Sequence, residues 1–231
     1  MVKINMGKLI TIDGPDGAGK NTQSALLCDY LTQKGHSVHM LSFPDYENES
    51  SALVRMYLSG ALGKNPADTN AYAASMLFAA DRYISYRTKW EKYAHDPDTV
   101  IIANRYTTAN AVHQLAKLGR ELWDEFLSWL WDFEFSRLGV PKPDLILYFD
   151  IPPAASMRLV DERSRQTGQK KDIHELDREY IENCYTAAQF AASRLKWHII
   201  SCCEPLSEKM RTKEDIFDDI VSAVSFLSLS S

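Results

Sequence analysis

Five short apolar runs alternate with stretches of helical periodicity, and this alternation constrains the fold of the chain more than any other feature. The runs lie at residues 10–13, 38–43, 99–104, 144–150 and 197–202. Strands that alternate with helices form parallel sheets, and right-handed crossovers place the helices on both faces. We therefore predict an α/β fold with a five-stranded parallel sheet. Ligands bind at the carboxyl ends of such strands, so Asp13, Phe43, Asn104 and Asp150 should lie near one rim.

Length and charge limit the classes of protein to which the chain could belong. Its 231 residues suit a single domain, 1–231, and the net charge of -5 argues against a general nucleic-acid or membrane binder. Any anionic ligand must therefore meet a local cluster of donors. No apolar stretch approaches 18 residues and no secretory segment is visible, so we expect a soluble, cytoplasmic protein.

Four cysteines show no spacing typical of a metal site or a disulfide framework. We expect reduced thiols in the core. Cys202 and Cys203 are adjacent on a predicted strand, so their side chains should point to opposite faces of the sheet.

Residues 14–22 read Gly-Pro-Asp-Gly-Ala-Gly-Lys-Asn-Thr, between the strand predicted over 8–13 and a helix predicted over 22–33. In a loop of this kind the glycines free backbone N–H groups to point at phosphate oxygens, and the lysine reaches the β- and γ-phosphates. An ordinary glycine turn is the alternative, but a lysine directly after the last glycine has no turn-forming purpose. The residues predicted to bind ATP are Gly14, Gly17, Ala18, Gly19, Lys20, Asn21 and Thr22.

Asn21 stands where the phosphate-loop pattern has a hydroxyl residue that ligates Mg²⁺. An asparagine carbonyl can ligate a hard cation, but it carries no charge, and Mg²⁺ normally relies on carboxylates and substrate phosphates. Asn21 and Asn104 are the candidate metal ligands. Asp13, beside the loop, could supply the missing charge through a water molecule.

Three further segments follow the loop in a fixed order: Phe43-Pro44-Asp45-Tyr46, Leu77-Phe78-Ala79-Ala80-Asp81-Arg82, and Asn104-Arg105-Tyr106 with Asn110 and His113 beyond it. With the loop and residues 135–144, they resemble the thymidylate kinase family of P-loop nucleoside monophosphate kinases. The resemblance runs from about residue 8 to residue 205. It implies a P-loop kinase fold with a lid, and ATP, Mg²⁺ and dTMP as ligands.

The resemblance assigns the thymine base to Phe78, which stacks on it, and to Arg82, which donates to a base carbonyl. Helical spacing of i, i+4 places both side chains on one face. A stacked base gains on the order of 1 to 3 kcal/mol, while a directed donor selects among bases. The alternatives are a core Phe78 and a surface Arg82 paired with Asp81.

Arg105 resembles the family's arginine that binds the phosphate of the nucleoside monophosphate. A guanidinium suits this role because it can donate two hydrogen bonds to one phosphate. Asn110 resembles a base contact, with a turn cap as the alternative. Asp16 matches a residue near the sugar hydroxyl, with helix capping as the alternative. His113 replaces a tyrosine that in relatives crowds the ribose 2′ position. The residues predicted to bind dTMP are Asp16, Phe43, Tyr46, Phe78, Arg82, Arg105, Asn110, His113, Asp172 and Glu175.

Residues 161–175 are polar and nearly free of large apolar side chains, as is typical of a mobile lid. In some relatives a loop arginine stands beside the family aspartate. Here Gly17 takes that place, so the resemblance implies that a lid arginine, Arg163 or Arg165, stabilises the transferred phosphate. Lys170 and Lys171 could add positive charge. The predicted catalytic residues are Lys20, Asp16, Arg105, Arg163 and Arg165.

Three departures from the family pattern concern metal and phosphate: Asn21, Asn104 in place of an aspartate, and Asp45 where close relatives carry arginine. Asp45 would repel a monophosphate unless it faces a lysine or arginine. Our interpretation is transfer of phosphate from ATP to dTMP, with the rate and acceptor choice left open. The alternatives are a catalytically weakened nucleotide sensor or partner, and a nucleoside kinase, for which Asn104 offers no general base.

Residues 121–138 form an aromatic-rich helical segment with an apolar stripe. Trp131 and Phe135 fall off that stripe, which favours a second buried face against a partner subunit and hence a homodimer.

Overall fold

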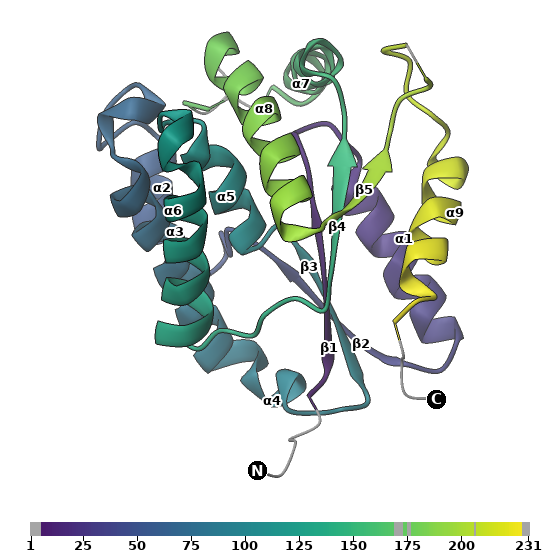
Figure 1. The fold of residues 1–231 in the computed structure, drawn as a ribbon. Coiled ribbons are helices and arrows are strands. Elements are labelled where there is room, and N and C mark those ends of the chain that lie inside the picture. Colours follow the sequence, from purple (N-terminus) through teal and green to yellow (C-terminus); the bar gives the residue numbers. More distant parts are fainter. Residues whose placement is uncertain (1–5, 169–172, 175–176, 206, 228–231) are drawn as a thin grey trace.

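All five apolar runs form strands of one parallel sheet, with the order β2-β3-β1-β4-β5 (Figure 1). The computed structural model describes residues 6–168, 173–174, 177–205 and 207–227. The strands are β1 (Lys8–Asp13), β2 (Ser37–Ser42), β3 (Thr99–Asn104), β4 (Leu145–Asp150) and β5 (His198–Ser201). The predicted sheet is confirmed, and Asp13, Phe43, Asn104 and Asp150 all end or directly follow a strand at the same rim.

The helices lie on both faces of the sheet, as predicted (Figure 1). α1 and α9 cover one face, where their apolar residues pack on β1 and β4, while α5, α6 and α8 cover the other face. The helices are α1 (Lys20–Gln33), α2 (Ala52–Leu58), α3 (Ala71–Ser85), α4 (Glu91–Ala94), α5 (Thr107–Leu115), α6 (Trp123–Trp131), α7 (Pro153–Thr167), α8 (Arg178–Leu195) and α9 (Lys213–Val224).

β1 lies at the centre of the sheet, between β3 and β4. Every residue of β3 is buried, and so is β1 from Leu9 onward, because helices cover both faces. Ile12 pairs with Asn104 in the register, and the backbone N–H of Arg105 donates to the carbonyl of Ile12 at 2.9 Å. The segments that leave β1 and β3 are therefore held side by side.

The aromatic segment is less regular than predicted. A 3-10 turn (Arg120–Leu122) precedes α6, and a π-helical turn (Asp132–Arg137) follows it. Trp131 and Phe135 are half-buried, and their rings pack edge to face at 5.4 Å on the chain's own apolar clusters. The second face predicted from these two residues is thus partly covered by the chain itself.

The cysteines are free thiols, with Cys184, Cys202 and Cys203 buried and Cys28 half-buried, as predicted. The prediction that Cys202 and Cys203 point to opposite faces is wrong. β5 ends at Ser201, so strict alternation stops before them, and both side chains pack in the cluster beneath α9. No helix in the described part of the chain is long and apolar enough to span a bilayer.

Candidate active site

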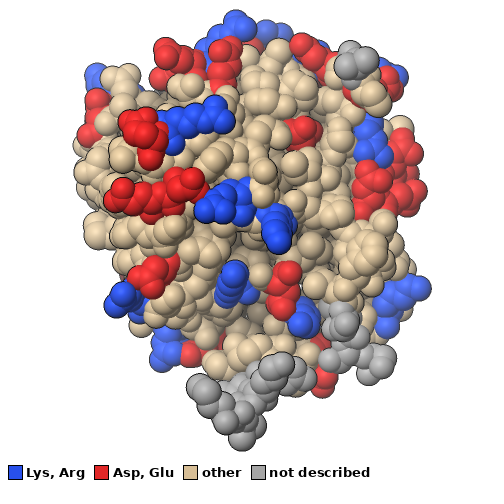
Figure 2. All heavy atoms as spheres, in the orientation of Figure 1, with Lys and Arg blue, Asp and Glu red and all other residues tan. Residues whose placement is uncertain are grey.

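A cavity of about 1120 Å³ opens at the carboxyl ends of the strands, between the glycine-rich loop, α3, α5 and α7. Figure 2 shows acidic and basic side chains interspersed over one face of the molecule rather than gathered into a broad basic surface. The predicted site residues that line the cavity are Asp16, Gly17, Ala18, Gly19, Lys20, Asn21, Phe43, Tyr46, Phe78, Arg82, Asn104, Arg105, Asn110, His113 and Arg163.

The glycine-rich loop has the backbone that its sequence predicts. Gly14, Gly17 and Gly19 have φ values of 146°, 82° and 79°, in a region that other residues rarely adopt. A Cβ on Gly17 would lie 2.6 Å from the Cβ of Leu159, so this glycine also lets α7 approach the loop. Gly14 and Thr22 do not line the cavity themselves.

Lys20, the first residue of α1, folds back onto the loop. Its Nζ donates to the carbonyls of Gly14 at 2.9 Å and Pro15 at 2.7 Å, and the side chain is buried. Burial, and then the positive charge of Arg105, lower the pKa of Lys20 to about 8. The lysine thus holds the loop in shape with a weakened preference for its charged form.

Asp16 joins the loop to Arg105 through an ion pair. Arg105 donates to Oδ1 of Asp16 at 2.7 Å, and Nζ of Lys20 lies 3.7 Å from the same oxygen. Burial raises the pKa of Asp16, but the positive charges of Arg105 and Lys20 outweigh it and hold that pKa below its ordinary value. The capping alternative is wrong, because Gly19 is the N-cap of α1 and no side chain caps it.

Arg105 has a left-handed φ of 64°, which costs a non-glycine residue free energy and aims its side chain across the rim. Burial lowers its pKa, and the carboxylates of Asp16 and Asp13 more than reverse this, so the net pKa of Arg105 is raised. The guanidinium stays charged at all working pH values.

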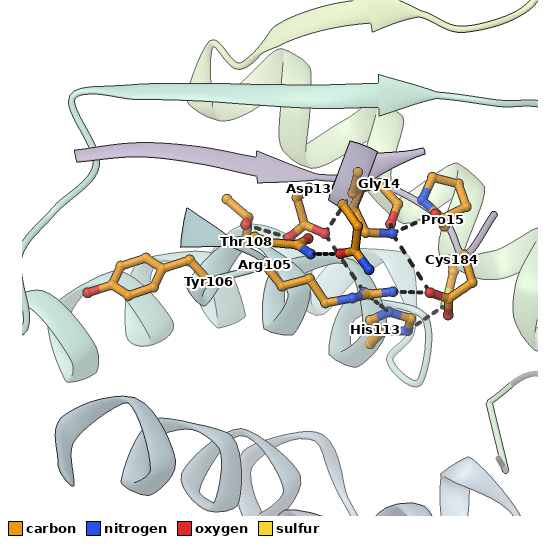
Figure 3. A network of polar contacts seen from close by, with 12 residues as sticks. Asp13, Gly14, Pro15, Arg105, Tyr106, Thr108, His113 and Cys184 are labelled. Atoms are coloured by element: carbon orange, nitrogen blue, oxygen red, sulfur yellow. Dashed lines mark hydrogen bonds and ion pairs between the residues drawn. The ribbon is translucent and has the colours of Figure 1, made fainter. Parts of the chain in front are cut away.

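His113 lies between Arg105 and Cys184 (Figure 3), with 3.4 Å from its Nε2 to NH1 of Arg105 and 3.5 Å from its Nδ1 to Sγ of Cys184. Burial, and then the charge of Arg105, lower the pKa of His113 to about 3. A neutral imidazole can accept from Arg105 at Nε2. His174 stacks on it with ring centroids 4.9 Å apart.

Ile173 and His174, inside the predicted lid, are buried. Ile173 packs in a cluster with Tyr57 and Phe78, and Nε2 of His174 lies 2.8 Å from the hydroxyl of Tyr57. The prediction of a polar lid over residues 161–175 is therefore wrong at these two positions, whose side chains are buried against the rest of the chain. Asp172 and Glu175 lie outside the described residues.

Arg82 is buried, with 2% of its surface exposed, and it forms a two-pronged ion pair with Glu134. Its Nε and NH2 donate to the two carboxylate oxygens at 2.7 and 2.5 Å. The alternative of a surface pair with Asp81 is wrong, since Asp81 accepts from Ser50 and from the backbone of Asp45 instead. Phe78 is half-buried: it packs against the cluster of Tyr57 and Ile173 and also lines the cavity, so it is only in part a core residue.

Glu134 was missed by sequence reasoning. It is fully buried, and it accepts hydrogen bonds from Arg82, from Thr107 at 2.7 Å and from Asn110 at 3.5 Å. The available signal was its position: four residues after Leu130, an acidic side chain falls on the apolar stripe of the helix. The π-helical turn, a feature common at functional sites, carries it inward.

Asn110 lies inside α5, buried, and donates to the carbonyl of Ser75 at 3.2 Å, so the turn-cap alternative is wrong. Gln114 lies one helical turn later and also lines the cavity. Its carboxamide oxygen and nitrogen are buried and find no partner among the described residues. Such an amide has unused donor and acceptor capacity for a ligand, and sequence reasoning missed it.

The chain matches the family model described as thymidylate kinase over residues 12–212. It is 34% identical over 177 residues to a thymidylate kinase of Mycobacterium tuberculosis, covering 74% of this chain and 79% of the relative. A probable thymidylate kinase of Thermococcus onnurineus is 30% identical over 220 residues, covering 93% and 96%. This chain belongs to the thymidylate kinase family. A solved structure of Candida albicans thymidylate kinase has the same fold, with a TM-score of 0.65, 20% identity and coverage of 95% of this chain and 92% of that one.

Asp45 departs from the thymidylate kinase pattern, and beside a phosphate site its carboxylate needs a lysine or arginine as a partner. The structure supplies Lys89. Oδ2 of Asp45 lies 2.6 Å from Nζ of Lys89, which cancels the charge that would repel a phosphate. Arg55 also lines the cavity and supplies a cation on that side.

The two arginines of the predicted lid differ in position. Arg163 on α7 lines the cavity, and its positive charge is one of those that lower the pKa of Lys20. Arg165 is exposed and is not among the lining residues. Lys170 and Lys171 lie outside the described residues.

Asn21 and Asn104, the candidate metal ligands, contact each other. Nδ2 of Asn104 donates to Oδ1 of Asn21, while Oδ1 of Asn104 is buried without a partner among the described residues. Asp13 accepts from the backbone of Gly14 at 2.8 Å and from Thr108 at 2.5 Å, so its oxygens are engaged too. Among the described residues, no three His, Cys, Asp or Glu side chains are grouped as a metal site would require. These residues do not fit a site that ligates Mg²⁺ directly.

We predict that nucleotide binding at pH 8 is accompanied by proton uptake at Lys20. Its pKa of about 8 leaves it partly neutral in the free protein, and phosphate oxygens would raise that pKa and bind a proton. Calorimetric titration with ATP in buffers of different ionisation enthalpy measures the uptake. Lys20→Arg is the matched control, because an arginine is already protonated. Equal uptake in both proteins would contradict the assignment.

Proposed function

We propose that this protein transfers the γ-phosphate of ATP to dTMP, giving ADP and dTDP. One observation carries the proposal. Lys20, in the glycine-rich loop, and Arg105, at the end of the neighbouring strand, converge on one carboxylate oxygen of Asp16 at 3.7 and 2.7 Å. A phosphate donor on the loop and a phosphate acceptor on Arg105 would therefore meet between two cations.

The proposed chemistry is positioning and electrostatics, without a covalent intermediate. ATP phosphates would draw Nζ of Lys20 away from the carbonyls of Gly14 and Pro15, and the N–H groups at the start of α1 would face them. The guanidinium fork of Arg105 would orient the acceptor phosphate. Asp16, released from Arg105, could then accept from a sugar hydroxyl. Because Asn21 and Asn104 do not fit as ligands of Mg²⁺, the protein would leave that ion to the ATP phosphates, whose negative charge it would offset.

The acceptor base is proposed to lie against Phe78, with its edge toward α5. Glu134 fixes two donors of Arg82 and neutralises its charge, so the arginine is held rigidly beside the base. The carboxamides of Asn110 and Gln114 would complete recognition of an edge that carries both donors and acceptors, as thymine does. Phe43, Tyr46 and His113 would enclose the sugar and phosphate, and Asp172 and Glu175 stay predicted contacts.

A coupled assay of ADP release tests the function. We expect turnover with ATP and dTMP, little turnover with thymidine in place of dTMP, and loss of activity in Lys20→Ala. Nucleotide binding by calorimetry without phosphorylation of any nucleoside monophosphate would instead favour the sensor. Faster phosphorylation of thymidine than of dTMP would favour a nucleoside kinase. Because both nucleotides are intracellular metabolites, we place the enzyme in the cytoplasm.

We predict that Arg163, rather than Arg165, stabilises the transferred phosphate. Of these two arginines, only Arg163 lines the cavity. Arginines that stabilise a transferred phosphate contribute at least on the order of 10³ in rate. Arg163→Gln should therefore lower kcat strongly with a smaller change in the KM for dTMP. Arg165→Gln, two residues away on the same helix, is the matched control and should stay close to wild type. The reverse order of effects would contradict this assignment.

We propose a homodimer formed through α3. Tyr72, Met76 and Tyr83 lie along one side of this helix with 38%, 53% and 37% of their surface exposed, and the ring of Tyr72 lies 4.6 Å from that of Trp129 on α6. Apolar side chains gathered in this way are typical of an interface. Met76→Glu should shift the protein to monomer in sedimentation experiments. Met40→Glu, at an exposed methionine on β2, is the control, and a monomeric wild type would contradict the proposal.

A further inference from the structure

We propose that Asn21 and Asn104 work as one hydrogen-bonded unit that presents a neutral N–H donor to the nucleotide's phosphates. This donor takes the place where the family pattern puts a metal ligand. The inference rests on the proposed binding of ATP to the glycine-rich loop. Its consequence is that the loop holds a nucleotide with an affinity that depends little on Mg²⁺.

Asn104 is the fixed member of the unit. It ends β3, is 8% exposed, and its backbone carbonyl accepts from the N–H of Phe43 at 3.0 Å. Its register partners are Ile12 on β1 and Ser42 on β2, so strands on both sides hold it. Its Nδ2 donates to Oδ1 of Asn21. The rigid residue therefore decides which end of the Asn21 carboxamide points back toward β3.

Asn21 is the exposed member, at the second residue of α1 and on the wall of the cavity. Its oxygen is engaged by Asn104, whereas its Nδ2 makes no hydrogen bond within the described part of the chain. An amide N–H at a helix N-terminus adds to the backbone donors and to the favourable dipole there, all of which suit an anion. A carbonyl in the same place would face the phosphates with the wrong sign.

The charges around the pair support the same conclusion. The cavity wall holds Lys20, Arg105 and Arg163, while Asp13 is engaged by Gly14, Thr108 and, at 3.8 Å, Arg105. Two neutral carboxamides replace a hydroxyl and a carboxylate, so the site carries one negative charge fewer than the family pattern. A site that ligates Mg²⁺ needs such charge, whereas a site that binds phosphate directly is better without it.

The test measures the affinity of a non-hydrolysable ATP analogue by calorimetry, in EDTA and in excess Mg²⁺. For wild type we expect the two dissociation constants to differ by less than about threefold. Asn104→Asp replaces the donor by a group that only accepts, so Asn21 must turn its nitrogen inward and its carbonyl toward the phosphates. This variant should lose about tenfold or more in affinity in EDTA.

Asn104→Leu is the matched control, because it keeps a side chain of similar size and removes the donor without adding a charge. It should lose less affinity in EDTA than Asn104→Asp. The double variant Asn21→Thr with Asn104→Asp restores the family pattern and should gain a dependence on Mg²⁺ of about tenfold or more. If Asn104→Asp fails to fold, Asn21→Asp at the exposed position serves instead. It should weaken binding in EDTA, with recovery in Mg²⁺.

Tightening of wild-type binding by about tenfold or more on adding Mg²⁺ would overturn the inference. Equal affinities of wild type and Asn104→Asp in EDTA would overturn it as well. These results are distinct from failure of the proposed function, which would appear as no nucleotide binding in either condition. A protein that phosphorylates dTMP but binds ATP only with Mg²⁺ keeps its function and loses this inference.

Discussion

The ion pair between Asp16 and Arg105 is the interaction on which the rest of the site depends. It joins the segments that leave β1 and β3, and these are neighbours only because β1 lies next to β3 in the sheet. The pair keeps Asp16 ionised and Arg105 charged, and burial together with the same guanidinium lowers the pKa of His113 and keeps that imidazole neutral. Sheet order thus fixes the protonation states that a phosphate ligand would meet.

The fold and the loop could be predicted because their signals are local. These signals are the periodicity of the strands, the positions of the glycines and the lysine after them, and all belong to consecutive residues. The structure confirms all five predicted strands and the left-handed backbone of Gly17 and Gly19. The partner of a buried charge is not local. Arg82 meets Glu134 across 52 residues of sequence, through a π-helical turn that no regular helix period predicts.

The errors of sequence reasoning have the same origin. Residues 161–175 are polar on average, but Ile173 and His174 are buried because Tyr57 and Phe78 offer them a surface. An average over a segment cannot record such a contact. Gln114 was missed for a related reason: an amide next to His113 has no distinguishing pattern, and only its unpartnered burial beside the cavity marks it.

Departures from a family pattern are easily taken as losses, yet in this protein each one has a partner. Asp45 pairs with Lys89, Asn21 with Asn104, and the smaller ring of His113 stacks with His174. An unpaired polar or charged group in a buried phosphate site costs about 1 to 3 kcal/mol, so a lone substitution there would weaken the fold as well as the chemistry. Paired substitutions reduce that cost, although Oδ1 of Asn104 stays buried without a partner among the described residues. The number of departures therefore measures how far this site has diverged, while the contacts among them determine whether its capacity to bind phosphate is retained.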